Sequence, residues 1–103
     1  MILKAAAQSD LQEGEILGVE IGGKKLALYL IAGKVYATDD ECSHVGCSFS
    51  KDGAVDGLEV ECLCHGSRFI IPTGETTAPP AFDPVAVYTV EVQADAVMVD
   101  ISE

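Results

Sequence analysis

The sequence is poor in basic and aromatic residues and contains no tryptophan. Six Lys and Arg stand against 17 Asp and Glu, which leaves a formal net charge of −11 at pH 7. Such a surface repels nucleic acid and anionic membranes, and the few aromatic residues form no stacking platform in a basic groove. We therefore expect no nucleic-acid or membrane partner. The charge serves either solubility alone or the attraction of a protein with a basic docking face.

Long apolar runs and targeting signals are also missing. No apolar run approaches the roughly 20 residues that a membrane helix needs. The start, Met1-Ile2-Leu3-Lys4, lacks the basic region and long apolar stretch of a secretory signal. Hydrophobic residues make up 49% of the 103 residues, enough for the core of one small domain. We expect a single domain over residues 1–103 and a cytoplasmic location.

A sustained 3.6-residue apolar period is absent, so the sequence predicts strands and not long helices. Gly22-Gly23 and Ala32-Gly33 predict tight turns, and Ala94-Asp95 a two-residue hairpin. The apolar run at 26–31 is typical of a strand that is buried on both faces. The other predicted strands cover residues 15–21, 35–38, 58–61, 68–71, 85–93 and 96–101, with one helical turn near residues 9–11.

Residues 39–84 differ in character, because they hold all four Cys, both His and all four Pro. Long irregular segments in a compact domain are usually functional or are tied down by a bound group. We therefore predict an all-β fold, a small antiparallel sandwich or open barrel, with a loop-rich cluster-binding lobe inserted at about residues 39–84.

Two short motifs carry the chemistry: Cys42-Ser43-His44 and Cys62-Leu63-Cys64-His65, with 17 residues between His44 and Cys62. Two thiolates and two imidazoles can hold one iron with sulfur and the other with nitrogen. That ligation is the Rieske form of a [2Fe–2S] cluster. We predict that Cys42 and Cys62 bind the inner iron, and that His44 and His65 bind the outer one.

This donor set favours electron transfer. Neutral imidazoles add less negative charge than thiolates, so the reduced state costs less and the potential rises. Rieske centres span about −150 to +300 mV, against about −400 mV for all-cysteine plant-type clusters. Gly46 and Gly66 follow the two ligand pairs. Both glycines let the backbone approach the cluster and aim N–H groups at sulfur.

Other roles for these residues stay open. A Cys2His2 set also suits tetrahedral zinc, although the spacings are tight for one ion and two cysteines would have no role. Four cysteines could form the disulfide framework of a secreted domain, but all four lie within 23 residues and beside the only two histidines. Chemical analysis separates these cases: two irons and two labile sulfides per chain, or one zinc and no sulfide.

The count of histidines argues against catalysis. A Rieske oxygenase needs a second, mononuclear iron held by two His and a carboxylate. His44 and His65 are the only histidines, and the cluster uses both. No other group is placed for general base or nucleophilic catalysis. The chain is therefore predicted to move electrons and not to transform a substrate.

Residues 42–47 (Cys-Ser-His-Val-Gly-Cys) and 62–67 (Cys-Leu-Cys-His-Gly-Ser) resemble the Rieske family. Residues 13–19, 26–29 and 35–40 extend the resemblance to the small ferredoxins of bacterial ring-hydroxylating dioxygenases, of the naphthalene-dioxygenase type. The resemblance implies an antiparallel β-sandwich that carries one [2Fe–2S] cluster. It also implies the partners: a flavin-dependent ferredoxin reductase that supplies single electrons and a terminal oxygenase that receives them.

The chain departs from those ferredoxins at Cys47 and Cys64, which match a disulfide of the Rieske proteins in respiratory cytochrome bc complexes. That resemblance implies a Cys47–Cys64 disulfide, with two free thiols as the alternative. It also keeps open a second function, as a Rieske subunit or fragment of a respiratory or arsenite-type oxidase complex. The redox potential discriminates between the two functions, near −150 mV for the ferredoxin and strongly positive for the oxidase subunit.

Ser67 and Phe69 bear on the potential. Ser67 matches the serine of high-potential Rieske proteins whose hydroxyl bonds a bridging sulfide. Phe69 stands where those proteins have a tyrosine that donates to a ligand sulfur. Since hydrogen bonds to sulfur raise the potential, one missing donor predicts a redox potential between those of the dioxygenase ferredoxins and the respiratory Rieske proteins.

Pro79-Pro80 resembles the proline loop that covers the cluster in the family.

Overall fold

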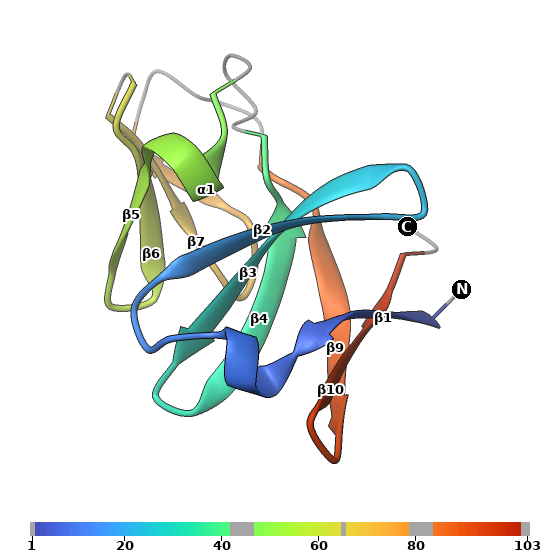
Figure 1. Cartoon of the computed structure of the whole chain (residues 1–103). Coiled ribbons are helices and arrows are strands. Elements are labelled where there is room, and N and C mark those ends of the chain that lie inside the picture. Colours follow the sequence, from blue (N-terminus) through green and yellow to red (C-terminus); the bar gives the residue numbers. More distant parts are fainter. Residues whose placement is uncertain (1, 42–46, 65, 79–83, 102–103) are drawn as a thin grey trace.

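The structure is a computed structural model, and it describes residues 2–41, 47–64, 66–78 and 84–101 (Figure 1). Within these residues the chain forms short strands and two helical segments of at most four residues. In chain order the elements are β1 (Ile2–Ala7), the 3-10 turn η1 (Gln8–Asp10), β2 (Ile16–Ile21), β3 (Lys24–Ile31), β4 (Lys34–Asp39), α1 (Phe49–Asp52), β5 (Gly53–Asp56), β6 (Glu59–Cys62), β7 (Ser67–Ile70), β8 (Thr76–Ala78), β9 (Val87–Gln93) and β10 (Ala96–Asp100).

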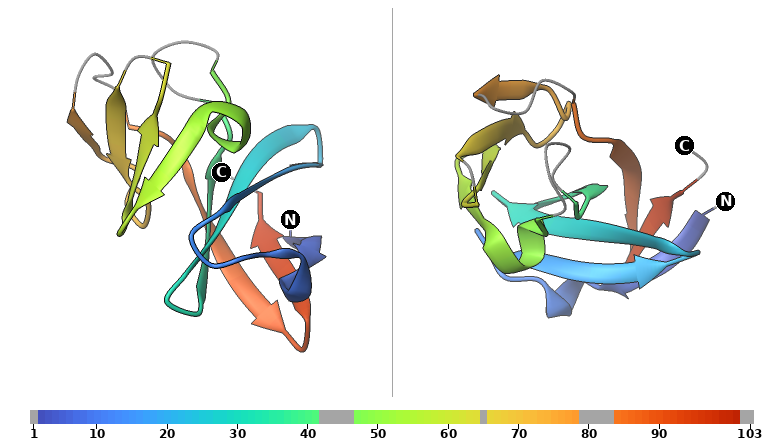
Figure 2. Two further views of the ribbon diagram at one scale, coloured as in Figure 1. Left: turned by 60° about the vertical axis from the view of Figure 1, so that its left-hand side comes forward. Right: turned by 90° about the horizontal axis from the view of Figure 1, so that it is seen from above.

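The strands form two antiparallel sheets. The first has six strands in the order β1-β10-β9-β4-β3-β2, and the second has four in the order β5-β6-β7-β8. Edge strands β1 and β2 come into contact, so the first sheet curls into an open barrel (Figure 2). The second sheet is inserted between β4 and β9, which pair with each other. The predicted fold class, an all-β open barrel with an inserted lobe, is confirmed.

The predicted turns are present where the sequence places them. Gly22 and Gly23 have φ of 57° and 80° and join β2 to β3 in a two-residue hairpin. This left-handed pair matches the twist of the flanking strands, and glycine adopts it without steric cost. Ala94 also has a positive φ, 55°, in the hairpin between β9 and β10.

Strand β3 lies between two hydrophobic cores, as its continuous apolar run predicts. Leu26 and Leu28 pack into the barrel core with residues of β10, including Val97. Ala27 and Tyr29 point the other way, into a core shared with the second sheet. All four β3 side chains are fully buried. Alternate residues of a strand face opposite sides, so this strand joins the barrel to the lobe.

The core shared with the second sheet is built around aromatic side chains and one cysteine. The rings of Phe49 and Phe69 meet edge to face, with their centroids 5.5 Å apart. Val60 and Cys62 of β6 lie in the same cluster. Tyr29, Phe49 and Tyr88 are all buried in the two cores, whereas Phe82 lies outside the described residues.

Tyr29 makes a buried hydroxyl pair with Thr38 in this core. Its O–H donates to Thr38 Oγ1 over 2.8 Å, because the Thr38 proton is already donated to the Asp39 carbonyl. We expect Tyr29→Phe to lower the free energy of unfolding by about 1 kcal/mol at pH 7, measured by urea titration with circular dichroism. Tyr36→Phe, on a half-buried ring, serves as the control and should change stability less.

The Tyr29→Phe variant also tests how the free energy of unfolding depends on pH. Burial raises the pKa of Tyr29 well above the ordinary tyrosine value of about 10. A raised folded-state pKa gives stability that is complete below pH 10 and is lost as the pH rises beyond it. The gap between wild type and Tyr29→Phe should therefore narrow from pH 10 upward. A gap that stays constant to pH 11 contradicts this assignment.

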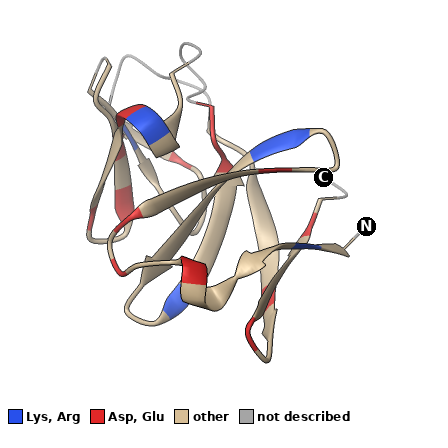
Figure 3. Cartoon of the chain, in the orientation of Figure 1, with Lys and Arg blue, Asp and Glu red and all other residues tan. Residues whose placement is uncertain are grey.

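Acidic residues are spread over both sheets, whereas Lys and Arg are few (Figure 3). On the outer face of the second sheet, Arg68 of β7 bonds three carboxylates. Nε lies 2.8 Å from Glu59, Nη2 2.8 Å from Asp56 and Nη1 3.2 Å from Glu61. The hydrogen bond to Glu59, followed by that to Asp56, raises the pKa of the guanidinium above its ordinary value. Arg68 therefore balances three neighbouring carboxylates.

This guanidinium spans β5, β6 and β7, so its loss leaves three carboxylates facing one another. We expect Arg68→Ala to lower the melting temperature by several degrees, and the loss to shrink in 0.5 M salt because salt screens that repulsion. Thermal scans at low and high salt measure both. Lys34→Ala is the matched control, because it removes a cation that lies over the half-buried Tyr36 ring. A deficit that is independent of salt contradicts the electrostatic explanation.

Candidate metal centre

Cys62 is the one predicted cluster ligand that the structure describes. Cys42, His44 and His65 lie outside the described residues, as do Gly46 and Pro79-Pro80. Cys62 ends β6, an interior strand, and pairs in register with Gly53 of β5 and Ser67 of β7. Its side chain is 1% exposed. The strand pairing therefore holds this sulfur at a fixed, dry position.

Both segments that carry the predicted ligands are closed at their base. Glu41 and Ser48 form an antiparallel bridge across the first segment. The second segment leaves β6 and returns in β7, and the Gly66 N–H donates to the Cys62 carbonyl over 2.8 Å. Gly66 has φ +82°, a conformation that favours glycine and that the short turn requires. The described residues that flank each segment are thus held in place.

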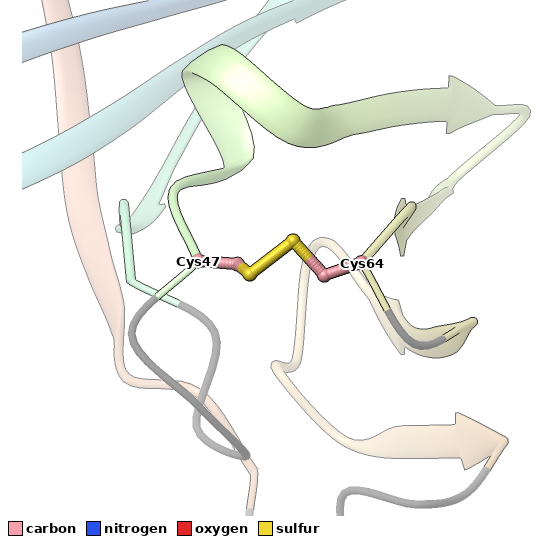
Figure 4. Close-up of a disulfide and its surroundings, with 2 residues drawn as sticks. All are labelled: Cys47 and Cys64. Carbon is pink, nitrogen blue, oxygen red and sulfur yellow. A yellow bond between two sulfur atoms is a disulfide. The ribbon is translucent and has the colours of Figure 1, made fainter.

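A disulfide between Cys47 and Cys64 joins the two loops, with a Cα–Cα separation of 6.7 Å (Figure 4). This is the pair that the resemblance to the respiratory Rieske proteins implies. The Sγ atoms of Cys47, Cys62 and Cys64 all lie within 4.8 Å of one another. The disulfide therefore places the end of the first loop beside the buried Cys62 sulfur of the second.

The donor chemistry at this place fits an iron–sulfur cluster. Cys62 is buried and lies outside the disulfide, and as a thiolate it would be a soft ligand. Bridging of Cys47 and Cys64 gives both remaining cysteines a role, which the zinc interpretation left unexplained. Once these two cysteines are paired, the motifs still contain two Cys and two His, which are the four ligands that a Rieske cluster requires.

Ser67 and Phe69 lie next to this centre on β7. Ser67 is fully buried and pairs in register with Cys62. Phe69 is also fully buried, with its ring against Phe49, so it fills core volume where a tyrosine would add a hydroxyl. The effect of both residues on the potential stays a prediction.

Sequence reasoning missed the short helix α1 and the residues that connect it to the two loops. The Leu63 N–H donates to the carbonyl of Asp52, the last residue of α1, over 2.7 Å. The Asp40 carboxylate, at the base of the first loop, accepts hydrogen bonds from Ser48 and Ser50. A Ser-x-Ser directly after the Cys47 motif is the only sequence signal for this contact, and it is a weak one.

Comparison with known proteins agrees with this geometry. The Rieske [2Fe-2S] domain family matches residues 1–89. The ferredoxin component of the naphthalene 1,2-dioxygenase system of Pseudomonas putida is 41% identical over 100 residues, covering 97% of this chain and 95% of its own length. Among the described residues, no helix is long and apolar enough to cross a membrane.

Solved structures agree as well. A ferredoxin of Sphingomonas yanoikuyae superposes with a TM-score of 0.91 at 32% identity, covering 97% of this chain and 98% of its own. The ferredoxin in a complex of reduced oxygenase and oxidised ferredoxin of carbazole 1,9a-dioxygenase gives 0.87 at 39% identity, over 95% of this chain and 100% of its own. The chain therefore belongs to the Rieske [2Fe–2S] family, and its relatives are ferredoxin components of aromatic dioxygenase systems.

Proposed function

We propose that this chain is a one-electron carrier that delivers electrons to the terminal oxygenase of an aromatic-ring dioxygenase. The observation that carries the proposal is full-length similarity to ferredoxin components, one of them solved in complex with its oxygenase. The absence of any histidine beyond the two predicted ligands supports a carrier over a catalyst. We also propose that the chain receives these electrons from a flavin-dependent reductase and that it works in the cytoplasm.

Within this function, Cys42, His44, Cys62 and His65 would hold one [2Fe–2S] cluster. The cluster supplies reversible one-electron chemistry when bound. The chain supplies the rest: Cys62 presents a buried thiolate, and the Cys47–Cys64 disulfide holds the two ligand loops together. The acidic surface suits a partner with a basic docking face.

The second candidate, a Rieske subunit of a respiratory or arsenite-type oxidase, is favoured by the disulfide alone. A measured potential near −150 mV supports the ferredoxin, and a strongly positive one supports the oxidase subunit. Metal analysis comes first: the purified chain should hold two irons and two labile sulfides, and reduction with dithionite should give a Rieske-type EPR spectrum. A colourless chain with zinc and no sulfide contradicts both candidates.

A further inference from the structure

We propose that Asp40 is a positioning residue for the first ligand loop, residues 42–47, and that it acts together with the Cys47–Cys64 disulfide. The proposal rests on the cluster ligation given above, because that loop carries two of the four proposed ligands. Asp40 itself touches no proposed ligand side chain among the described residues. Its effect on the cluster is transmitted through the residues that close the loop.

The Asp40 carboxylate accepts three hydrogen bonds from the residues that follow the loop. Oδ1 accepts from the Ser50 backbone N–H at 2.8 Å, and Oδ2 accepts from the Ser50 hydroxyl at 2.7 Å and the Ser48 hydroxyl at 2.5 Å. Asp40 is 8% exposed, and its bonds to the half-buried Ser48 and Ser50 are partly buried. Hydrogen bonds to an ionised acceptor are roughly twice as strong as neutral ones.

The backbone of Asp40 makes two further bonds. Its carbonyl accepts from the Phe49 N–H at 2.7 Å, and its N–H donates to the Lys25 carbonyl at 3.0 Å. Asp40 therefore connects the end of β4 both to β3 and to the first turn of α1. Between the end of β4 and the start of α1, the Glu41–Ser48 bridge closes the loop. A single residue thus fixes the relative position of the two ends of the first ligand loop.

The same contacts reach the second ligand loop through α1. The α1 residue Phe49 packs in one core cluster with Cys62, and the Asp52 carbonyl accepts from the Leu63 N–H at 2.7 Å. A shift of α1 away from Asp40 would therefore move supports of both loops. Asp40 holds them at the base, whereas the Cys47–Cys64 disulfide holds them together further along the chain.

Gly18 of β2 leaves room for this arrangement. A Cβ at Gly18 would lie 2.5 Å from Ser50 Oγ and 2.8 Å from Ser50 Cβ. Gly18→Ala should thus displace the Ser50 hydroxyl without changing any charge. A cavity of about 380 Å³, lined by Gly18, Ser48 and Ser50 among others, lies beside these groups. Water from this cavity can compete for the Asp40 carboxylate once Ser50 moves.

The test compares Asp40→Asn with Asp39→Asn in the cluster-loaded protein. Both remove one negative charge at neighbouring positions, but Asp39 accepts from Tyr88 instead of from the loop-closing serines. The readouts are the EPR spectrum after dithionite and the rate at which visible absorbance is lost to an iron chelator. We expect Asp40→Asn to alter the g values and to speed cluster loss on the order of tenfold. Asp39→Asn should leave the spectrum unchanged and the rate within about twofold.

Milder variants keep the proposal testable where Asp40→Asn does not fold. Ser50→Ala and Gly18→Ala should each speed cluster loss about threefold, the effect of one weakened hydrogen bond. Ser9→Ala, which removes an exposed hydroxyl bonded to Asp95, is the matched control and should match wild type.

A second arm repeats the Asp40→Asn comparison in a chain that carries Cys47→Ser and Cys64→Ser. If both restraints hold the same loop, the combined acceleration should exceed the product of the separate ones. Equal rates and spectra for Asp40→Asn and Asp39→Asn overturn the proposal while the cluster assignment stands. A wild-type chain without iron and sulfide overturns the cluster assignment itself.

Discussion

Replacement of Cys62 by serine is expected to yield a chain that purifies without its cluster. Iron and labile sulfide should fall from two each per chain to near zero, and the visible colour and Rieske-type EPR signal should vanish with them. Cys62 is the buried, strand-fixed sulfur beside the disulfide, and the other two described cysteines are joined to each other in that disulfide. Serine has nearly the same volume, so the fold should survive, with circular dichroism reporting the β structure.

Ser67→Ala is the matched control for that experiment. Ser67 is fully buried and pairs in register with Cys62, so both substitutions perturb the same place by a similar volume. The Ser67→Ala chain should keep its two irons, with a lower potential in voltammetry if the hydroxyl bonds a bridging sulfide. A Cys62→Ser chain with two irons and an unaltered spectrum contradicts the proposed ligand set.

The elements that the sequence predicts well are those specified by local pattern. The run from Leu26 to Tyr29 has no charged residue, and a strand between two cores buries all of it. Gly22 and Gly23 both adopt left-handed conformations that few other dipeptides favour. In such places a few neighbouring residues are enough to predict the local structure.

Other elements depend on partners that are distant in the sequence. The α1 residues Phe49–Asp52 and the strand β5 (Gly53–Asp56) are four residues long, too short to show a period. Strand β5 forms because it pairs with β6 from Gly53 to Asp56. The first turn of α1 is held by a hydrogen bond to Asp40 and by the contact of Phe49 with Phe69. The contact of Arg68 with Asp56 likewise spans twelve positions. Such contacts become visible only when the chain is folded.

The candidate metal centre also has features that the local sequence predicts and features that depend on distant residues. The ligand motifs are local, so the sequence alone is enough to propose Cys42, His44, Cys62 and His65 as the ligands. The pairing of Cys47 with Cys64 came from resemblance, since spacing by itself leaves several pairings possible. The carboxylate of Asp40 at the base of the loop had no local signal beyond two nearby serines. It could be recognised only from the distances between these groups.

Removal of the Cys47–Cys64 disulfide is expected to be the most destabilising change outside the ligand set. For the double variant Cys47→Ser, Cys64→Ser, a bridge across 17 positions predicts a loss of about 3 kcal/mol in the cluster-free chain, on the chain-entropy treatment. Urea unfolding followed by circular dichroism measures it. Alkylation of the denatured wild type without reductant checks the premise, because neither Cys47 nor Cys64 should react.

The loss should be concentrated in the lobe that the disulfide serves. Strands β9 and β10 pair with each other and with β1 and β4, away from the two loops, so their amides should keep their hydrogen-exchange protection. The amides of Leu63 and Gly66, which bond to Asp52 and Cys62, should exchange faster. Uniform loss of protection over both sheets would instead mean that the chain unfolds as one cooperative unit.

The cluster-loaded protein gives the sharper comparison. A cluster that binds only the folded lobe holds the same two loops that the disulfide joins, and it adds its own binding free energy to the folded state. Loss of the disulfide should then cost less in the loaded chain than in the cluster-free chain, because the ligands continue to restrain residues 42–47 and 62–65. Equal losses in both forms would mean that the disulfide and the cluster act on separate parts of the lobe.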